Sequence, residues 1–196
     1  MEVLYELLKA VHIISFVFMS IPLFNLIVVA ERGKFGPDIN YPVDIYMENI
    51  LSGGSTRCFV YQATVGISGI LLLIYGSLGI EALWTEWIIL LKTVLLFILI
   101  ALLSRVHFKI QPAIDTIFEN LSPEVQISDD NMTKLRSLRG FRKKLASFCL
   151  FLVLTIIILG FQVYNIYSPI FTGSLVLMAA LFSRRVYSKG IPFGWI

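Results

Sequence analysis

The chain has 196 residues and a net charge of +3, and 57% of its residues are hydrophobic, with a mean hydropathy of +0.82. Soluble domains are about 45–50% apolar, so long apolar runs with this excess predict an integral membrane protein with an all-α fold. The basic residues flank the apolar runs, so membrane topology explains the charge and we expect no nucleic-acid partner. Two cysteines are too few for a disulfide framework, and two histidines are too few for a zinc site of their own.

The first apolar stretch, residues 3–30, is predicted to be a transmembrane helix that Pro22 kinks. Five of its side chains lie three or four residues apart and therefore share one helix face: Tyr5, Lys9, His12, Phe16 and Met19. That face is more polar than the others, so we expect it to point into the bundle and away from lipid.

Residues 31–55 are predicted to form a polar connection, because they contain several glycines and prolines that favour turns. Within it, residues 43–51 are compatible with a short interfacial helix. The second span is expected at residues 56–78. Small or polar residues recur there at helical spacing, on a face that suits close helix packing and one interhelical hydrogen bond: Gln62, Gly66, Gly69 and Gly76.

The third span is expected at residues 84–108 and begins with Trp84 and Trp87, which suit the membrane interface. Lys92 interrupts the apolar run. An ionisable group at that depth is costly, so it is treated as a functional residue by default. The alternative is that the lysine side chain extends to the headgroups.

Residues 110–141 are predicted to form a second long polar loop, with a short amphipathic helix at 130–140. Two further spans are expected at residues 142–163 and 168–185. The chain is therefore predicted to be a single domain with five transmembrane helices, or four if the last, short stretch does not span the bilayer.

The distribution of basic residues predicts the orientation. If the N-terminus is outside, fourteen of the sixteen lysines and arginines lie on the inner side, and only Lys9 and Lys92 do not. Such a bias sets the topology of short-loop membrane proteins. We expect a multi-pass protein of the cell membrane with its N-terminus outside and its C-terminus in the cytoplasm.

The residue numbers of His12 and Lys92 predict that both lie at a similar depth below the outer edge of the membrane. A helix rises about 1.5 Å per residue, so His12 lies roughly 13 Å below the outer edge and Lys92 roughly 12 Å below it. His107 lies roughly 34 Å along the third span, at the inner face. His12 and His107 are therefore too far apart to hold one haem between them. The alternatives are a histidine hydrogen-bonded within the bundle for His12 and an interfacial histidine for His107.

A second candidate cluster lies at the inner face, where Cys58, His107 and Cys149 are expected at similar depth. Thiolate and imidazole ligands together suit copper(I) or zinc. The alternative is that both cysteines are small hydrophobic residues in the helix interfaces.

The pattern Lys-Ala-x-His-Ile-Ile at Lys9, Ala10 and His12–Ile14 resembles the first transmembrane segment of HemJ-type protoporphyrinogen oxidases. The pattern Trp-x-x-x-Leu-Lys, which ends at Lys92, is similar to that family and to CopD-like copper-resistance membrane domains. The similarity covers the first three spans. It implies a b-type haem near His12 and a functional Lys92, with Arg57 as the counterpart of an arginine in the family's second span.

The first functional hypothesis is a haem b protein that transfers electrons or oxidises a porphyrinogen. His12 would be the axial ligand of the haem iron. Lys92 would pair with a propionate or handle protons as the catalytic residue. Further cofactor contacts are predicted at Lys9, Gln62 and Arg57. Quinone or a periplasmic electron carrier would exchange electrons with the haem.

Two other functions remain open from the sequence. A copper-transport or copper-resistance protein would use these candidate ligands: His12, Met19, Cys58, His107 and Cys149. An accessory subunit without a cofactor would instead support a larger membrane complex through its glycine-rich second span and its polar loops. In each case we expect the chain to associate with copies of itself or with other membrane subunits.

Overall fold

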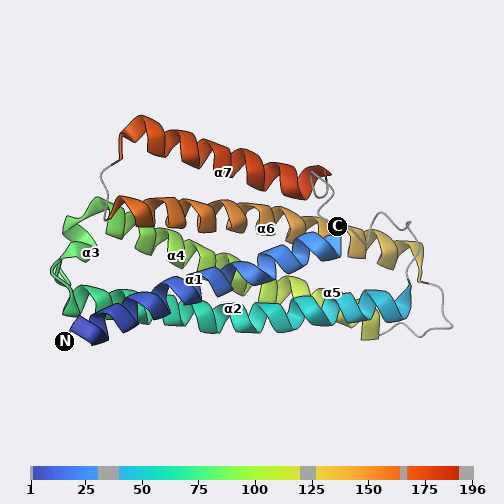
Figure 1. Ribbon diagram of the computed structural model, residues 1–196. Helices are drawn as coiled ribbons and strands as arrows, with labels where there is room; N and C mark the ends of the chain where they lie inside the picture. The colour runs from blue at the N-terminus through green and yellow to red at the C-terminus, as the bar shows by residue number, and fades with distance from the viewer. Residues whose placement is uncertain (1, 31–39, 120–126, 164–166, 190–196) are drawn as a thin grey trace.

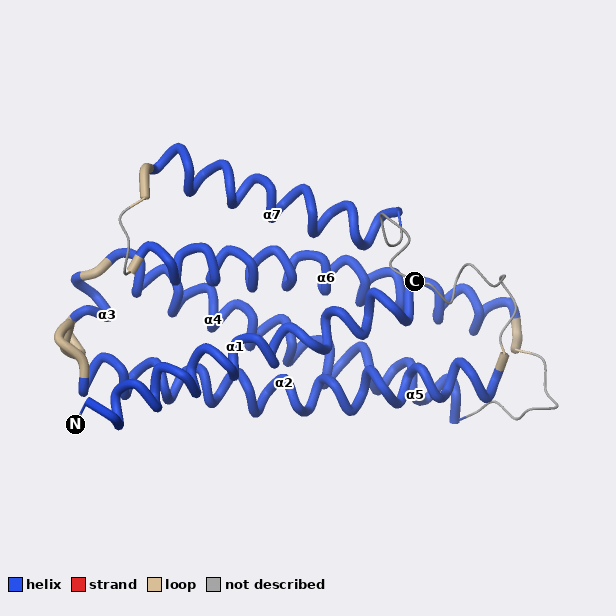
Figure 2. Tube along the Cα trace, viewed as in Figure 1, coloured by secondary structure: helices blue, strands red, loops and turns tan. Residues whose placement is uncertain are grey.

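The computed structural model describes residues 2–30, 40–119, 127–163 and 167–189. Every regular element within these residues is a helix, and they contain no strand (Figures 1 and 2). In chain order the elements are α1 (Glu2–Ala30), α2 (Tyr41–Tyr75), α3 (Ala82–Thr85), α4 (Trp87–Arg105), the π-helical turn η2 (Val106–Ile110), α5 (Gln111–Glu119), α6 (Asp129–Gln162) and α7 (Pro169–Lys189).

Five helical segments are long and apolar enough to cross a membrane: α1, α2, the continuous segment from α4 to α5, α6 and α7. Their directions alternate along the chain, so the bundle is antiparallel (Figure 1). The predicted all-α bundle of five spans is therefore confirmed. We call one end of the bundle the α3 end and the opposite end the α5 end, after the short helices that lie there (Figure 1).

The surface around the middle of the bundle is apolar. Large hydrophobic side chains are exposed on every long helix, among them Val17, Val60, Phe97, Phe161 and Met178. In water such a surface would be unfavourable, whereas in a bilayer it contacts lipid tails. The described helices therefore fit a protein that is surrounded by lipid.

The expected polar connection at residues 31–55 is wrong for its second half, while residues 31–39 lie outside the described residues. Helix α2 begins at Tyr41, and Asn40 caps it by accepting a hydrogen bond from the Val43 amide. Capping of this kind satisfies a free amide of the first helical turn. The expected short helix at residues 43–51 is simply the beginning of this long helix.

The expected loop at residues 110–141 is also largely helical. The chain continues from α4 through η2 into α5, and α6 already begins at Asp129, after the Ser128 cap. The expected short helix at 130–140 is the first part of α6. An apolar cluster holds these extensions together, because it buries Ile110, Ile114, Ile117, Phe118 and Leu135. The sequence analysis did not identify this cluster, whose residues meet across helices.

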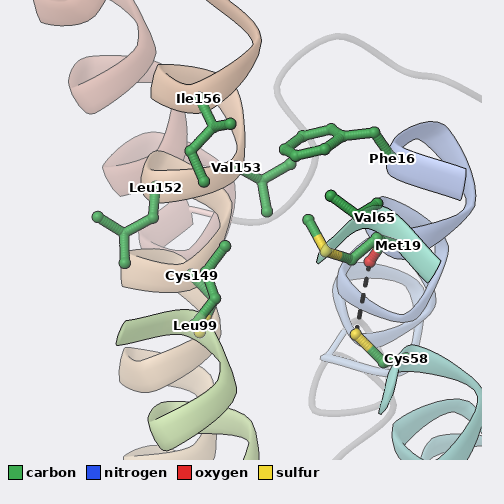
Figure 3. Packing of buried hydrophobic residues seen from close by; sticks show 9 residues of the cluster. All are labelled: Phe16, Met19, Cys58, Val65, Leu99, Cys149, Leu152, Val153 and Ile156. Carbon is green, nitrogen blue, oxygen red and sulfur yellow. Dashed lines mark hydrogen bonds between the residues drawn. The ribbon is translucent and has the colours of Figure 1, made fainter. Parts of the chain in front are cut away.

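The centre of the bundle is an apolar core that joins α1, α2, α4 and α6. Figure 3 shows its nine residues: Phe16, Met19, Cys58, Val65, Leu99, Cys149, Leu152, Val153 and Ile156. The Cys58 thiol lies 3.8 Å from the Met19 carbonyl oxygen. Close to it, Gly54 of α2 faces Pro22 of α1, and a Cβ at Gly54 would lie 3.5 Å from the proline ring, an ordinary van der Waals distance. Small residues allow close contact of helices in lipid.

Candidate functional site

The imidazole of His12 is oriented by α2. Its Nδ1 lies 3.0 Å from the hydroxyl oxygen of Ser68. That hydroxyl donates its own proton to the Thr64 carbonyl at 2.6 Å, so its oxygen accepts a hydrogen bond from Nδ1–H of His12. The proton of neutral His12 is therefore on Nδ1, and Nε2 carries a lone pair.

Space for the ring is provided by Gly69. A Cβ at this position would lie 3.3 Å from Cε1 of His12, closer than most side-chain contacts. The imidazole therefore lies against the backbone of α2. The sequence indicated Gly69 as part of a packing face, and in the structure the packing partner is the His12 ring.

Lys92 approaches the same place from α4. It is half-buried, and its positive charge lies close enough to His12 to act on it electrostatically. Its ammonium nitrogen lies 3.8 Å from the position of a Cβ at Gly160 of α6. Residues of α1, α2, α4 and α6 thus lie near His12 and Lys92, and their pairing in one functional site stays a prediction.

The other candidate cofactor contacts do not surround His12. Lys9 lies one helical turn away and forms an ion pair with Glu6 at 3.8 Å. Gln62 is buried but lies six residues before Ser68 on α2, a rise of roughly 9 Å. Arg57 is exposed and lies roughly 16 Å from Ser68 along the same helix, so it does not adjoin His12.

The expected metal cluster of Cys58, His107 and Cys149 does not assemble. His107 Nδ1 lies 2.9 Å from the Ser55 hydroxyl, and its ring packs edge-on against Phe59. The two cysteines are buried in the apolar core instead (Figure 3). Among the described residues, no three His, Cys, Asp or Glu side chains are grouped closely enough to hold a metal ion. The expectation is wrong because His107 faces aromatic rings while the thiols face the bundle centre.

A buried charge cluster near the α5 end was missed by the sequence analysis. Both terminal nitrogens of Arg142 donate hydrogen bonds to the Glu48 carboxylate, at 2.5 and 3.1 Å. Arg139 donates to Glu48 at 2.9 Å and to Asp44 at 3.1 Å. The Gln111 carbonyl accepts from Arg142 at 2.8 Å. Two carboxylates and two guanidinium groups balance each other, which allows Asp44, Glu48 and Arg142 to be buried, while the Arg139 side chain is 29% exposed.

A signal for this charge cluster was present in the sequence. Asp44 and Glu48 are four residues apart, and Arg139 and Arg142 are three apart, which places each pair on one helix face. The sequence does not show that the two pairs meet, because residues 43–51 and 130–140 were expected to form short, separate helices within polar connections.

Exposed basic side chains form a belt on α2, α4, α6 and α7. The basic belt consists of Arg57, Arg105, Lys144, Arg184 and Arg185. Neighbouring hydrogen bonds show which members lie at a similar level along the bundle. The bond between Ser55 and His107 joins positions two residues from Arg57 and from Arg105. The bond between Ser147 and Ser183 joins positions within three residues of Lys144, Arg184 and Arg185. The guanidinium of Arg105 also lies 5.1 Å from the centre of the Phe141 ring. Such a belt is typical of the boundary between lipid tails and headgroups.

Comparison of the chain with protein-family models, with curated proteins and with solved structures finds no match. The interpretation of the site therefore depends on its own geometry. Two features of that geometry bear on function: the free Nε2 of His12 and the nearby charge of Lys92.

Proposed function

We propose that the protein is an integral membrane haem b protein in which His12 would bind the haem iron. The observation that supports this proposal is the hydrogen bond from Nδ1–H of His12 to Ser68, which leaves the Nε2 lone pair available. Histidines that bind metals almost always donate their other ring N–H to an acceptor, which fixes the tautomer and the ring orientation. Imidazole is a common haem ligand, so the donor atom fits this cofactor.

The charge of Lys92 supports the same proposal. Within the described parts of the chain, Lys92 forms no ion pair with a carboxylate. A buried cation in a membrane protein is costly unless an anion compensates it. A haem propionate is such an anion, so Lys92 would hold one end of the cofactor while His12 holds the iron.

When bound, the haem would supply one-electron redox chemistry. The protein residues would bind and orient it, and Lys92 would hold or deliver a proton beside it. The resemblance to HemJ-type oxidases in the first and third spans makes a porphyrinogen one candidate electron donor. A quinone or a periplasmic electron carrier is the alternative partner.

We propose that the α5 end faces the cytoplasm. The basic belt, at the level of the middle of α2 and α6, lies closer to this end than His12 and Lys92 do, and positively charged residues are concentrated on the cytoplasmic side of membrane proteins. The N-terminus would then be outside, the C-terminus inside and the His12–Lys92 site in the outer half of the cell membrane. Arg32 and Lys34, which also entered this prediction, lie outside the described residues.

The experiment that tests the proposed function is an absorption spectrum of the full-length protein purified from haem-replete cells. We expect a Soret band that is lost in His12→Ala and retained in His107→Ala. The second variant is a matched control, because His107 also bonds a serine through Nδ1 but lies near the α5 end. A colourless wild-type protein, or a Soret band that survives in His12→Ala, would contradict the proposal. A colourless protein that co-purifies with other membrane subunits would support an accessory role instead.

A further inference from the structure

A narrow cavity of about 80 Å³ lies inside the bundle, between α1, α2, α4 and α6. Leu51 and Gln62 of α2 both line it, and the eleven residues between these positions correspond to a rise of roughly 16 Å. One buried water molecule needs about 10–15 Å³ of such volume, so the cavity has room for about five to eight of them. About six waters in single file, at a spacing of about 2.8 Å, already span that length. The cavity is therefore long and roughly one molecule wide.

The wall of this cavity is mostly apolar. Its polar lining residues are Ser55, Gln62, Gln111 and Arg142. Two of them already have partners inside the protein, because the Ser55 hydroxyl bonds His107 and the Gln111 carbonyl accepts from Arg142. A cavity with an apolar wall and a few polar groups is typical of a site for a small molecule.

The other two polar residues each carry a buried atom without a hydrogen-bond partner among the described residues. These atoms are Oε1 of Gln62 and Nε of Arg142, and the two residues are only 3% and 5% exposed. One atom is an acceptor and the other is a donor. They lie toward opposite ends of the cavity, because Arg142 bonds Glu48, which precedes Leu51 on α2. A ligand that fills the cavity therefore needs a donor at one end and an acceptor at the other.

The shape and the wall favour a hydrocarbon chain over water or a ring. A buried water needs two to four polar partners, and apolar cavities stay dry, so the apolar middle of this cavity suits water poorly. Carbon atoms in contact lie about 3.5–4.0 Å apart, so a single chain fits a passage one molecule wide, whereas a broad ring system does not. The charge of Arg142 is already compensated by its ion pair with Glu48, so an uncharged ligand fits best.

We propose that this cavity binds one uncharged hydrocarbon chain that carries an oxygen-containing polar group at each end, such as a long-chain diol or the ester of an ω-hydroxy fatty acid. A hydroxyl group at one end would donate to Oε1 of Gln62. A hydroxyl or carbonyl oxygen at the other end would accept from Nε of Arg142. The described lining of the cavity does not include His12, so this site is separate from the proposed haem site and needs no haem.

The test is equilibrium dialysis of the full-length protein in detergent against radiolabelled linear diols of about eight to twelve carbons, which span roughly 10–15 Å when extended. Protein-free micelles give the background. We expect about one bound molecule per chain for at least one of these diols. Its dissociation constant should rise roughly tenfold or more in Gln62→Leu, where the ligand hydroxyl loses its acceptor.

Two controls accompany the dialysis. Thr64→Val should bind the diol like the wild type, because the Thr64 hydroxyl bonds the Val60 carbonyl of its own helix. The linear alcohol of the same chain length should bind more weakly than the diol, because it leaves one of the two atoms unpartnered. No binding above that of protein-free micelles, or equal affinity in the wild type and Gln62→Leu, would overturn the proposal. A wild-type protein without a Soret band can still bind the diol, so the two proposals fail separately.

A second measurement uses the wild-type protein and does not depend on the folding of Gln62→Leu. Cys58 and Cys149 line the cavity, so a bound diol should slow the modification of both thiols by methylmercury severalfold. The exposed thiol of Trp84→Cys, outside the cavity, should react at the same rate with and without the diol. Unchanged rates at Cys58 and Cys149 under a diol concentration that saturates binding would show that the diol binds elsewhere and would overturn the proposal.

Discussion

The His12 ring has two neighbours on α2 that act in different ways. Ser68 accepts the Nδ1–H hydrogen bond, and Gly69 leaves the space in which the ring lies. The hydroxyl decides which nitrogen is protonated, and the glycine decides how closely the ring approaches the helix. A histidine held in this way loses little conformational freedom when it binds a ligand through Nε2, which favours binding.

Ser68→Ala removes the hydroxyl acceptor of His12. We expect the dissociation constant for haem to rise roughly 10–100-fold, as is typical when the group that orients a ligating histidine is lost. Haem titration of the purified protein, followed by absorbance, measures the change. Thr64→Val should leave the constant unchanged, because that hydroxyl does not contact His12. An unaltered affinity in Ser68→Ala would show that the serine does not orient the ligand.

Lys92→Met removes a positive charge near His12. A cation beside the haem disfavours the ferric state, which carries one more positive charge than the ferrous state. We therefore expect a lower midpoint potential in Lys92→Met, measured by a spectroelectrochemical titration. Lys144→Met, which removes an exposed charge of the basic belt, should leave the potential nearly unchanged. A potential that rises or does not change in Lys92→Met would argue against a site shared by Lys92 and the cofactor.

Among elements, the extensions of α2, α5 and α6 toward the α5 end are held by the charge cluster as well as by the apolar cluster beneath it. Asp44 is 1% exposed and Glu48 is 3% exposed, so each carboxylate depends on arginine partners from α6. Removal of one partner from a buried ion pair leaves an uncompensated charge, which is more costly than the absence of both partners.

Arg142→Met is therefore expected to destabilise the protein by about 3–5 kcal/mol, because Glu48 loses its bidentate partner. Thermal unfolding in detergent, followed by circular dichroism, measures the loss. Arg57→Met, at an exposed position on α2, should change stability by less than about 0.5 kcal/mol. The double variant Glu48→Gln/Arg142→Met should recover part of the loss. Equal stabilities for Arg142→Met and Arg57→Met would contradict this account of the cluster.

These extensions also mark the limit of what the sequence could predict. The five spans followed from long apolar runs, whose meaning depends little on the rest of the fold. For the charged beginnings of α2 and α6 the sequence predicted only short helices within polar connections. In the structure they are continuous with the long helices, and there Asp44 and Glu48 meet arginines more than ninety residues away. That pairing is a property of the assembled bundle and not of either segment.

The same distinction holds within the candidate site. His12 and Lys92 could be predicted because each is a polar exception in an apolar run, and depth along a helix follows from residue number. Ser68 and Gly160 were not predicted as site residues. Serine and glycine are common in membrane helices, and only the structure shows that one faces His12 and the other faces Lys92.

At the scale of the whole molecule, charge and polarity divide the bundle lengthwise. The basic belt and the charge cluster lie toward the α5 end, whereas His12 and Lys92 lie toward the α3 end, with the apolar core of Figure 3 between them. A site of this kind is closer to one side of the membrane than to the other. For the haem protein proposed above, an electron donor and a proton source would therefore not have to approach from the same compartment.

The orientation of the bundle can be tested with single cysteines in a Cys58→Ala/Cys149→Ala background. Trp84→Cys places an exposed thiol at the α3 end, and Lys144→Cys places one in the basic belt. Because a belt of lysine and arginine favours the cytoplasmic side, an impermeant thiol reagent added to intact cells should label Trp84→Cys only. Lys144→Cys should react after the membrane is permeabilised. The opposite pattern would place His12 and Lys92 in the inner half of the bilayer, and their substrate or electron donor would then have to be sought in the cytoplasm.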